Sequence, residues 1–269
     1  MGVINRRKGS EDHAPRKIGT RTRHMVVASL LATVSLSTIP VSPAGAEVSN
    51  CTQFGPGGNY FDGSWKPSSS YIGVSAEITV RYAAVCDSDT SQYNQATESV
   101  GNFSAAWSMI ADSGGNGWLQ SGYIRAYAQG DVSFSQEYNP YTIGLYTKFQ
   151  NGVSAGQVHQ YWQQASGGTY YSNVDTSRLI TVSAANLTYG WAGYSQQFFG
   201  EDKYLSSDMP GGVGSYGTSG TIQVQDSSDN WHNVTSGFLT TANDTYGNRW
   251  VVQSTGSQSF NIWTANYGV

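Results

Sequence analysis

A glutamine on one predicted strand and a glutamate at the end of another are the residues of this chain best suited to acid–base chemistry. Gln120 lies in the stretch Trp107–Arg125, among large apolar neighbours on one side of an alternating run. Glu201 closes the aromatic-rich run Tyr189–Gly200, and alternation places it beside Trp191. Burial near aromatic rings raises the pKa of a carboxyl group, which suits a general acid and base working in acid. A neighbouring carboxamide could donate its N–H to a developing oxyanion.

Both residues also have a purely structural interpretation. Gln120 could hydrogen-bond at the edge of a strand, and Glu201 could begin a surface loop with the sequence Glu-Asp-Lys. Because perturbed catalytic groups are few in any chain, the residue types alone favour the structural interpretation.

No other constellation in the sequence competes with this pair. The string Gly152–Gly156 has the G-x-S-x-G form of a nucleophile elbow, but that motif needs a strand–turn–helix in an α/β sheet. Here it lies between two predicted strands and indicates a hairpin turn. A metal site is disfavoured because only His159 and His232 remain in the exported chain, neither near a cysteine. We expect no cofactor.

A predicted hairpin positions Gln120. One side of its first run comprises Phe103, Ala105, Trp107, Met109 and Ala111. This period of two is typical of a half-buried strand. Residues Ser113–Gly117 supply a Gly- and Asn-rich turn. The second run begins at Trp118 and places Gln120 on the same side as Trp118 and Ile124.

Similar short runs fill the rest of the exported chain. Besides the hairpin, strands are expected over residues 74–85, 133–137, 141–149, 158–164, 179–183, 189–199, 221–225, 250–253 and 260–265. There is no helical stripe and no repeat at a fixed spacing. The pattern predicts an all-β, antiparallel sandwich or jelly roll, in one domain of about 220 residues. We place the sandwich at residues 74–269, after an irregular lead-in over residues 47–73.

The first 46 residues have the features of a secretory signal. Residues 1–24 carry seven Lys and Arg, residues 25–39 form a short apolar run, and residues 44–46 supply a small-x-small cleavage site. The apolar run is short for a membrane anchor and is followed by two prolines. We therefore expect a secreted, monomeric protein that is not inserted in the membrane after cleavage. Cys51 and Cys86 are expected to pair in the oxidising exterior.

Loss of the leader makes the chain acidic. The 14 Lys and Arg residues include seven in the leader, and the 18 Asp and Glu residues include two there, which leaves 7 basic and 16 acidic residues and a net charge of −9. An acidic surface disfavours nucleic acid and anionic membranes as partners. A polypeptide or a polysaccharide outside the cell is the expected partner. The 8 Trp and 18 Tyr residues could stack on sugars, although such rings also fill sandwich cores.

The order of motifs resembles the eqolisin-type glutamic peptidases. A β-branched strand ends near a cysteine over residues 76–86, followed by a Trp-led strand at Trp107 and an x-Q-x-G strand at residues 119–122. The segments at residues 134–140 and 198–202 are similar to the family's W-Y-E-x-Y-P and W-I-V-E-D motifs. Three features depart from the pattern: Phe134 and Ser135 replace the family's Trp, Gly200 stands where a hydrophobic residue is usual, and the cysteine pattern differs.

This resemblance implies a concanavalin-like sandwich and a secreted acid protease. Glu201 would activate water and protonate the leaving amine, and Gln120 would stabilise the tetrahedral intermediate. The residues expected to contact substrate are Trp118, Glu137, Tyr138 and Trp191. Two alternatives remain open at this point: a carbohydrate-binding module and a structural sandwich without enzymatic activity.

Overall fold

Two sheets of short strands make up the described part of the chain. In this computed structural model, the described residues are 60–67, 71–81, 83, 85, 103–111, 117–126, 130–139, 144–183, 195–202, 209–212, 214–237, 239–243 and 250–265. They contain strands and turns, and within these ranges no helix is long and apolar enough to cross a membrane. All of them belong to one compact unit, residues 41–269.

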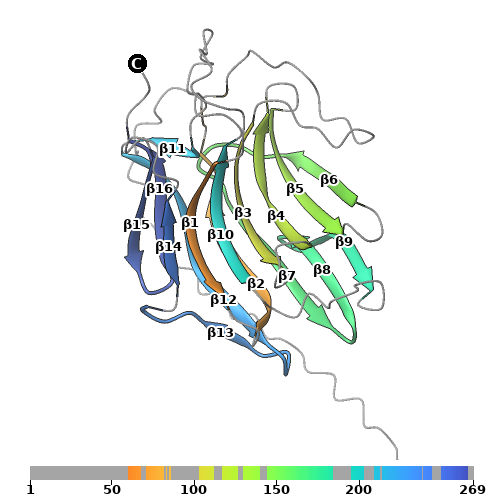
Figure 1. Ribbon diagram of the computed structural model, residues 1–269. Coiled ribbons are helices and arrows are strands. Elements are labelled where there is room, and N and C mark those ends of the chain that lie inside the picture. Colours follow the sequence, from red (N-terminus) through yellow and green to blue (C-terminus); the bar gives the residue numbers. More distant parts are fainter. Residues whose placement is uncertain are drawn as a thin grey trace, which may run out of the picture. The chain divides into compact units, whose positions relative to one another are not determined.

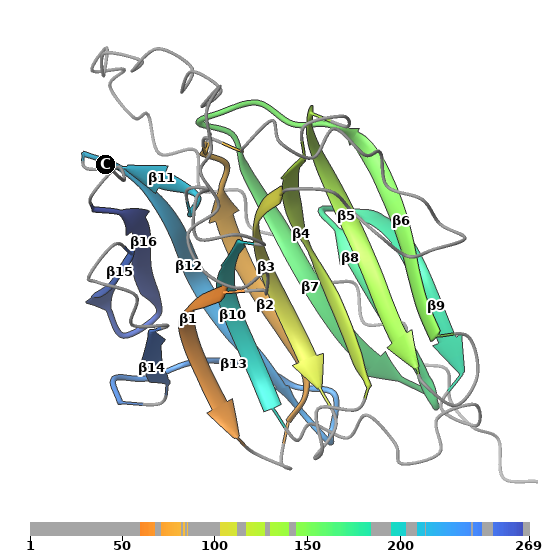
Figure 2. The same ribbon diagram turned by 45° about the horizontal axis from the view of Figure 1, so that its top comes forward.

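The first sheet has seven strands and carries the residues of interest. Its spatial order is β14 (Thr240–Asn243), β1 (Tyr60–Pro67), β10 (Ser195–Asp202), β3 (Phe103–Ala111), β4 (Trp118–Ala126), β5 (Gly130–Asn139) and β6 (Gly144–Gly152). Every neighbouring pair is antiparallel. Figures 1 and 2 show β10, β3, β4 and β5 side by side, so strands from distant parts of the sequence meet in the middle of this sheet.

The second sheet has nine strands. Its order is β15 (Trp250–Gly256), β16 (Ser259–Thr264), β11 (Gly211–Gly212), β12 (Ser215–Asp226), β2 (Tyr71–Thr79), β7 (Val158–Ser166), β8 (Thr169–Val174) and β9 (Ser177–Ser183), with β13 (Trp231–Asn233) paired to β12. All pairings are antiparallel except the short contact of β11 with β16. The predicted all-β, antiparallel sandwich is confirmed.

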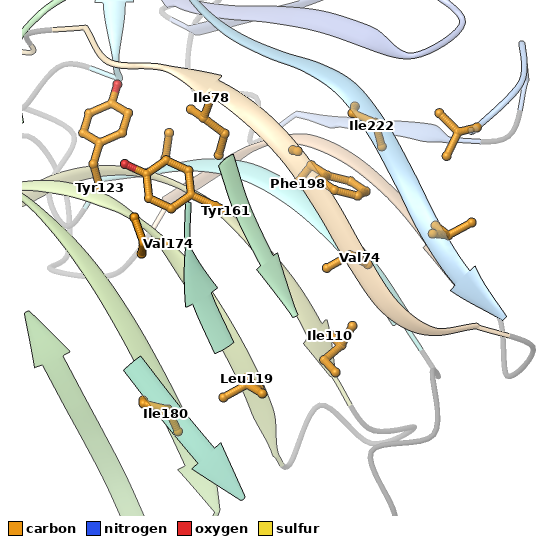
Figure 3. Packing of buried hydrophobic residues seen from close by; sticks show 14 of the residues in the cluster. Val74, Ile78, Ile110, Leu119, Tyr123, Tyr161, Val174, Ile180, Phe198 and Ile222 are labelled. Carbon is orange, nitrogen blue, oxygen red and sulfur yellow. The ribbon is translucent and has the colours of Figure 1, made fainter. Parts of the chain in front are cut away.

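Alternating side chains of both sheets form the core between them. Ile110, Leu119 and Phe198 of the seven-stranded sheet join Val74, Ile78, Tyr161 and Ile222 of the nine-stranded sheet in one buried cluster. Figure 3 shows these side chains directed toward one another between the two layers. Burial of a side chain of this size contributes about 1.5–3 kcal/mol, so this cluster is the main source of stability.

The seven-stranded sheet has an outer face, which is directed away from the nine-stranded sheet. It carries a second buried cluster made of Ala105, Trp107, Met109, Ala111, Ile124, Phe134 and Phe199. A polar group on this face therefore lies among apolar neighbours.

Several strand predictions were wrong in extent. Residues 60–67 were expected to be irregular, yet they form β1 between β10 and β14. The pattern was hard to recognise because the buried inner positions are the polar Asp62 and Ser64, while Phe61 and Trp65 lie on the outer face. Strands β8, β11, β13 and β14 were not predicted, since they are short and rich in polar residues or glycine.

The turn predicted at residues 152–156 is present, whereas several other predictions concern residues that are not described. Gly152–Gly156 does connect β6 to β7, and Gly156 has the positive φ of 86° that a tight turn needs. The proposed leader at residues 1–46, Cys51, Cys86 and Trp191 lie outside the described residues. The expected disulfide stays a prediction.

Candidate functional site

The strand register places Gln120 and Glu201 on the same face of one sheet. Strand β3 separates β4 from β10; Gln120 pairs with Met109, and Glu201 pairs with Ala105. Both partners belong to the outer-face cluster. In an ideal sheet this offset separates the two Cα atoms by about 13 Å along the strands and about 10 Å across them. Among the described side chains no hydrogen bond joins the two, so any joint action requires a group between them.

Trp107 occupies the middle of the diagonal from Gln120 to Glu201. It lies on β3, two residues from both Ala105 and Met109, and its side chain is 2% exposed. Its indole Nε1–H donates a hydrogen bond of 2.7 Å to Oε2 of Glu201. The bond fixes one carboxyl oxygen against the sheet and orients the other.

Aromatic rings surround the Glu201 carboxyl group, which is 8% exposed. The ring centroids of Trp107 and Phe199 are 5.4 Å apart, and Phe61 contacts both edge-on at 6.2 and 6.3 Å. A buried carboxyl group in such surroundings needs hydrogen-bond donors, because the apolar rings solvate no charge. The Trp107 indole supplies one.

Gln120 is held by a second carboxamide. Its Nε2 donates to Oε1 of Gln136 at 2.6 Å, and Nε2 of Gln136 donates to Oγ1 of Thr147 at 2.9 Å. Gln120 is 6% exposed and Thr147 7% exposed. The amide of Gln120 is therefore buried and fixed in orientation, and it keeps a second N–H for another acceptor.

Buried hydroxyl groups support the site from inside the sandwich. Ser172 Oγ of β8 lies 3.0 Å from the main-chain carbonyl oxygen of Gln120 and 3.0 Å from Ser135 Oγ. Ser121 Oγ donates to the main-chain carbonyl oxygen of Asn173 at 3.0 Å. These bonds tie β4 to the nine-stranded sheet directly behind Gln120, which limits movement of the strand that carries it.

The structure describes only some of the residues that were predicted to bind substrate. Trp118 lies on the outer face and packs against the outer-face cluster. The backbone of Tyr138 pairs with that of Trp118, and Glu137 pairs with Leu119; nothing further is described for the side chains of Glu137 and Tyr138. Trp191 is not described.

Sequence reasoning missed two contributors to this arrangement. Trp107 was predicted to lie on a strand but was given no role toward Glu201, and Gln136 was not singled out. Alternation with Phe134 could have placed Gln136 on the outer face, but only the register shows that it pairs with Gln120. The structure also explains why a glycine occupies position 200, because a Cβ there would lie 2.5 Å from Ile262 Cδ1 and 3.0 Å from Met209 Sδ.

The arrangement has the groups needed for acid–base chemistry on a carbonyl compound. A carboxyl group can move a proton, and a fixed amide N–H can stabilise negative charge on oxygen. Within the described ranges, no group of three or more His, Cys, Asp or Glu could hold a metal ion.

The sandwich is similar to solved structures of glutamic peptidases. Two structures of scytalidoglutamic peptidase with transition-state analogues match with TM-scores of 0.51 and 0.52 at 11% and 13% sequence identity. A member of the eqolisin family, SCP-B, in complex with the tripeptide Ala-Ile-His matches with a TM-score of 0.52 at 12% identity. Each match covers 78% of this chain and 100% of the other chain.

At these identities the likeness establishes the fold. The chain has the concanavalin-like sandwich of the eqolisin structures, as its motif order suggested. No family model and no curated protein matches the sequence.

Proposed function

We propose that this chain is a secreted, acid-active endopeptidase of the glutamic type. The observation that carries the proposal is the outer-face arrangement: a buried Glu201, oriented by Trp107, lies diagonally across β3 from a buried and oriented Gln120. A buried carboxyl group and a buried carboxamide directed to the same face are costly features of an otherwise apolar cluster. Catalysis of peptide hydrolysis accounts for both.

The reaction begins with water bound between the two residues. Glu201, whose Oε2 accepts the Trp107 N–H, accepts a proton from this water through its carboxylate. The water oxygen bonds to the carbonyl carbon of the scissile peptide, and the carbonyl π electrons move onto oxygen. The remaining N–H of Gln120 donates to this oxyanion, where its stabilising effect is largest.

The second half of the reaction returns the proton. Glu201, now protonated, donates to the peptide nitrogen, and the C–N bond breaks as the oxyanion reforms a carbonyl group. The products are a carboxylic acid and an amine, and Glu201 is ionised again. No covalent intermediate is required.

Digestion of an acid-denatured protein at about pH 4, near the ordinary pKa of Glu, tests this proposal. The wild-type chain should cleave and Glu201→Gln should not. Glu77→Gln is the matched control, since Glu77 is an exposed carboxylate on the nine-stranded sheet, and it should cleave like wild type. Equal cleavage by wild type and Glu201→Gln, or none by either, counts against catalysis by Glu201.

Polysaccharide binding is a second candidate, favoured by one feature of the nine-stranded sheet. Trp162 of β7 and Trp231 of β13 are partly exposed, and their rings meet edge to face at 6.4 Å. Such rings can stack on the apolar face of a sugar. Affinity electrophoresis in gels containing laminarin or xyloglucan tests this role: retardation of wild type that is lost in Trp231→Ala supports it, and no retardation in either gel opposes it.

A further inference from the structure

Three polar side chains form one row across the outer face. Gln120 on β4, Gln136 on β5 and Thr147 on β6 are directly opposed in the strand register. Directly opposed residues of antiparallel strands are close enough for their side chains to interact. Hydrogen bonds of 2.6 and 2.9 Å join the three in sequence, from Gln120 to Gln136 to Thr147.

The row has a consistent donor direction. Gln136 presents its Oε1 to Gln120 and its Nε2 to Thr147 Oγ1, so hydrogen bonds hold both ends of the Gln136 amide. One hydrogen of Gln120 Nε2 is then used by Gln136. Because the amide is planar, this bond fixes the direction of the second hydrogen.

A glutamine without such hydrogen bonds would not hold its N–H groups in one direction. The last torsion of a Gln side chain is broad and roughly two-fold, so its N–H groups have no strongly preferred direction. A donor that stabilises an oxyanion must be held in place before the reaction begins. Gln136 and Thr147 do not lie on the diagonal between Gln120 and Glu201, so they are placed to orient the donor and not to contact the reacting atoms.

We propose that Gln136 is a positioning residue, supported by Thr147, that aims the free N–H of Gln120 at the oxyanion. This inference rests on the proposed peptidase function and deepens it. Gln136 acts through Gln120 alone, so its contribution should appear in kcat and disappear when Gln120 no longer has an amide.

The test measures kcat and KM of four single variants on a peptide substrate at about pH 4. Misplacement of a catalytic group typically lowers the rate about 10-fold or more. Gln136→Leu keeps the side-chain size and removes the acceptor, so kcat should fall about 10-fold or more while KM changes little. Gln136→Glu keeps an accepting oxygen in either protonation state, so it should restore most of kcat. Thr147→Val should lower kcat, and Thr147→Ser, which keeps the hydroxyl group, should not.

Gln197→Leu is the matched control. Gln197 lies in the same row on the other side of Met109, and its amide donates to Ser195 at 2.9 Å instead of to Gln120. Its kcat should equal that of wild type. Thermal melting of each variant separates lost activity from lost folding.

The double variant Gln120→Leu/Gln136→Leu separates positioning from a general structural effect. If Gln136 acts through Gln120, the double variant is no slower than Gln120→Leu alone. Wild-type kcat in folded Gln136→Leu, or equal additional losses with and without the Gln120 amide, overturns the inference. If Gln136→Leu does not fold, a wild-type kcat in folded Thr147→Val overturns it instead. Wild-type activity of Gln120→Leu would refute the proposed function itself.

Discussion

The indole N–H of Trp107 and the carboxyl group of Glu201 form a buried hydrogen bond of 2.7 Å between β3 and β10. The two residues are not directly opposed: Trp107 pairs with Phe199, and Glu201 pairs with Ala105. The bond therefore runs diagonally over the sheet, and it directs the carboxyl group toward the side on which Gln120 lies.

Removal of this donor should slow the proposed reaction and change its pH dependence. Trp107→Phe keeps an aromatic ring and loses the N–H, and a hydrogen bond to a charged group contributes about 1.5–3 kcal/mol, or about 10-fold or more in kcat. The donor stabilises the ionised carboxylate, so its loss should move the acidic limb of the rate profile to higher pH. The measurement is kcat/KM against pH.

Trp162→Phe is the control for Trp107→Phe. Its indole also donates an N–H, to the main-chain carbonyl oxygen of Asp175 at 2.9 Å, but it lies on the nine-stranded sheet. Its pH profile should match wild type. A Trp107→Phe enzyme with an unshifted acidic limb contradicts the role assigned to the indole.

Gly122 of β4 pairs with Trp107 of β3, and only a glycine fits at this close approach of the two strands. A Cβ at this position would overlap the carbonyl oxygen of Ala106 and lie 2.7 Å from the Trp107 Cα. Backbone atoms cannot move aside as a flexible side chain can, so Gly122→Ala should reduce the free energy of unfolding by about 3 kcal/mol. Urea denaturation measures the loss.

The matched substitution is Gly220→Ala on β12. There the nearest atom to an added Cβ is the Glu77 carbonyl oxygen, at 4.0 Å, which is an ordinary contact. Gly220→Ala should leave the urea midpoint nearly unchanged. Equal midpoints for Gly122→Ala and wild type would show that β4 can move away from β3.

The fold and the face of the strand on which Gln120 and Glu201 each lie could be predicted because strand alternation is local. Gln120 shares a side with Trp118 and Ile124 in the sequence, and the structure places it there. Glu201 follows Phe199 at the same spacing. Period-two patterning identifies such positions without knowledge of the partner strands.

The contacts between strands could not be predicted in the same way. The pairings of Gln120 with Gln136 and of Glu201 with Ala105 depend on register, and a slip of one residue would move either side chain to the other face. Strand β1 was missed for a related reason. Its sheet is buried on both faces, so polar Asp62 faces inward while Trp65 packs on the outer cluster, and the expected contrast between faces is lost.

The core tyrosine Tyr161 should resist ionisation. Burial raises the pKa of its hydroxyl group far above the ordinary value of 10.0. A raised pKa means that the folded state favours the neutral form, so stability is lost as the pH rises above the value for the unfolded chain. Absorbance titration at alkaline pH should show Tyr161 ionising only as the protein unfolds.

Its hydroxyl group also lies 2.9 Å from Ser133 Oγ. Tyr161→Phe leaves the buried serine without this partner, at an expected cost of about 1–3 kcal/mol in unfolding free energy. Tyr146→Phe is the control, because Tyr146 is exposed. A Tyr161→Phe protein as stable as wild type would contradict a structural role for this hydrogen bond.

The turn between β12 and β13 should respond to acid through Asp226. Its carboxylate accepts hydrogen bonds from His232 Nε2 at 2.7 Å, Ser228 N at 2.8 Å and Asn230 N at 3.0 Å. These bonds, that from His232 foremost, hold the pKa of Asp226 well below its ordinary 3.8. Because the pKa is lowered in the folded state, the stabilisation is complete above pH 3.8 and is lost as the pH falls through the folded value.

Asp226→Asn should therefore melt at a lower temperature than wild type at about pH 5, and the gap should be narrower at about pH 2. Melting followed by circular dichroism at both pH values measures this gap. Asp229→Asn is the control in the same turn, because Asn tolerates the positive φ of 66° found at Asp229. A gap of the same width at both pH values would show that the Asp226 carboxylate does not stabilise the turn in its ionised form.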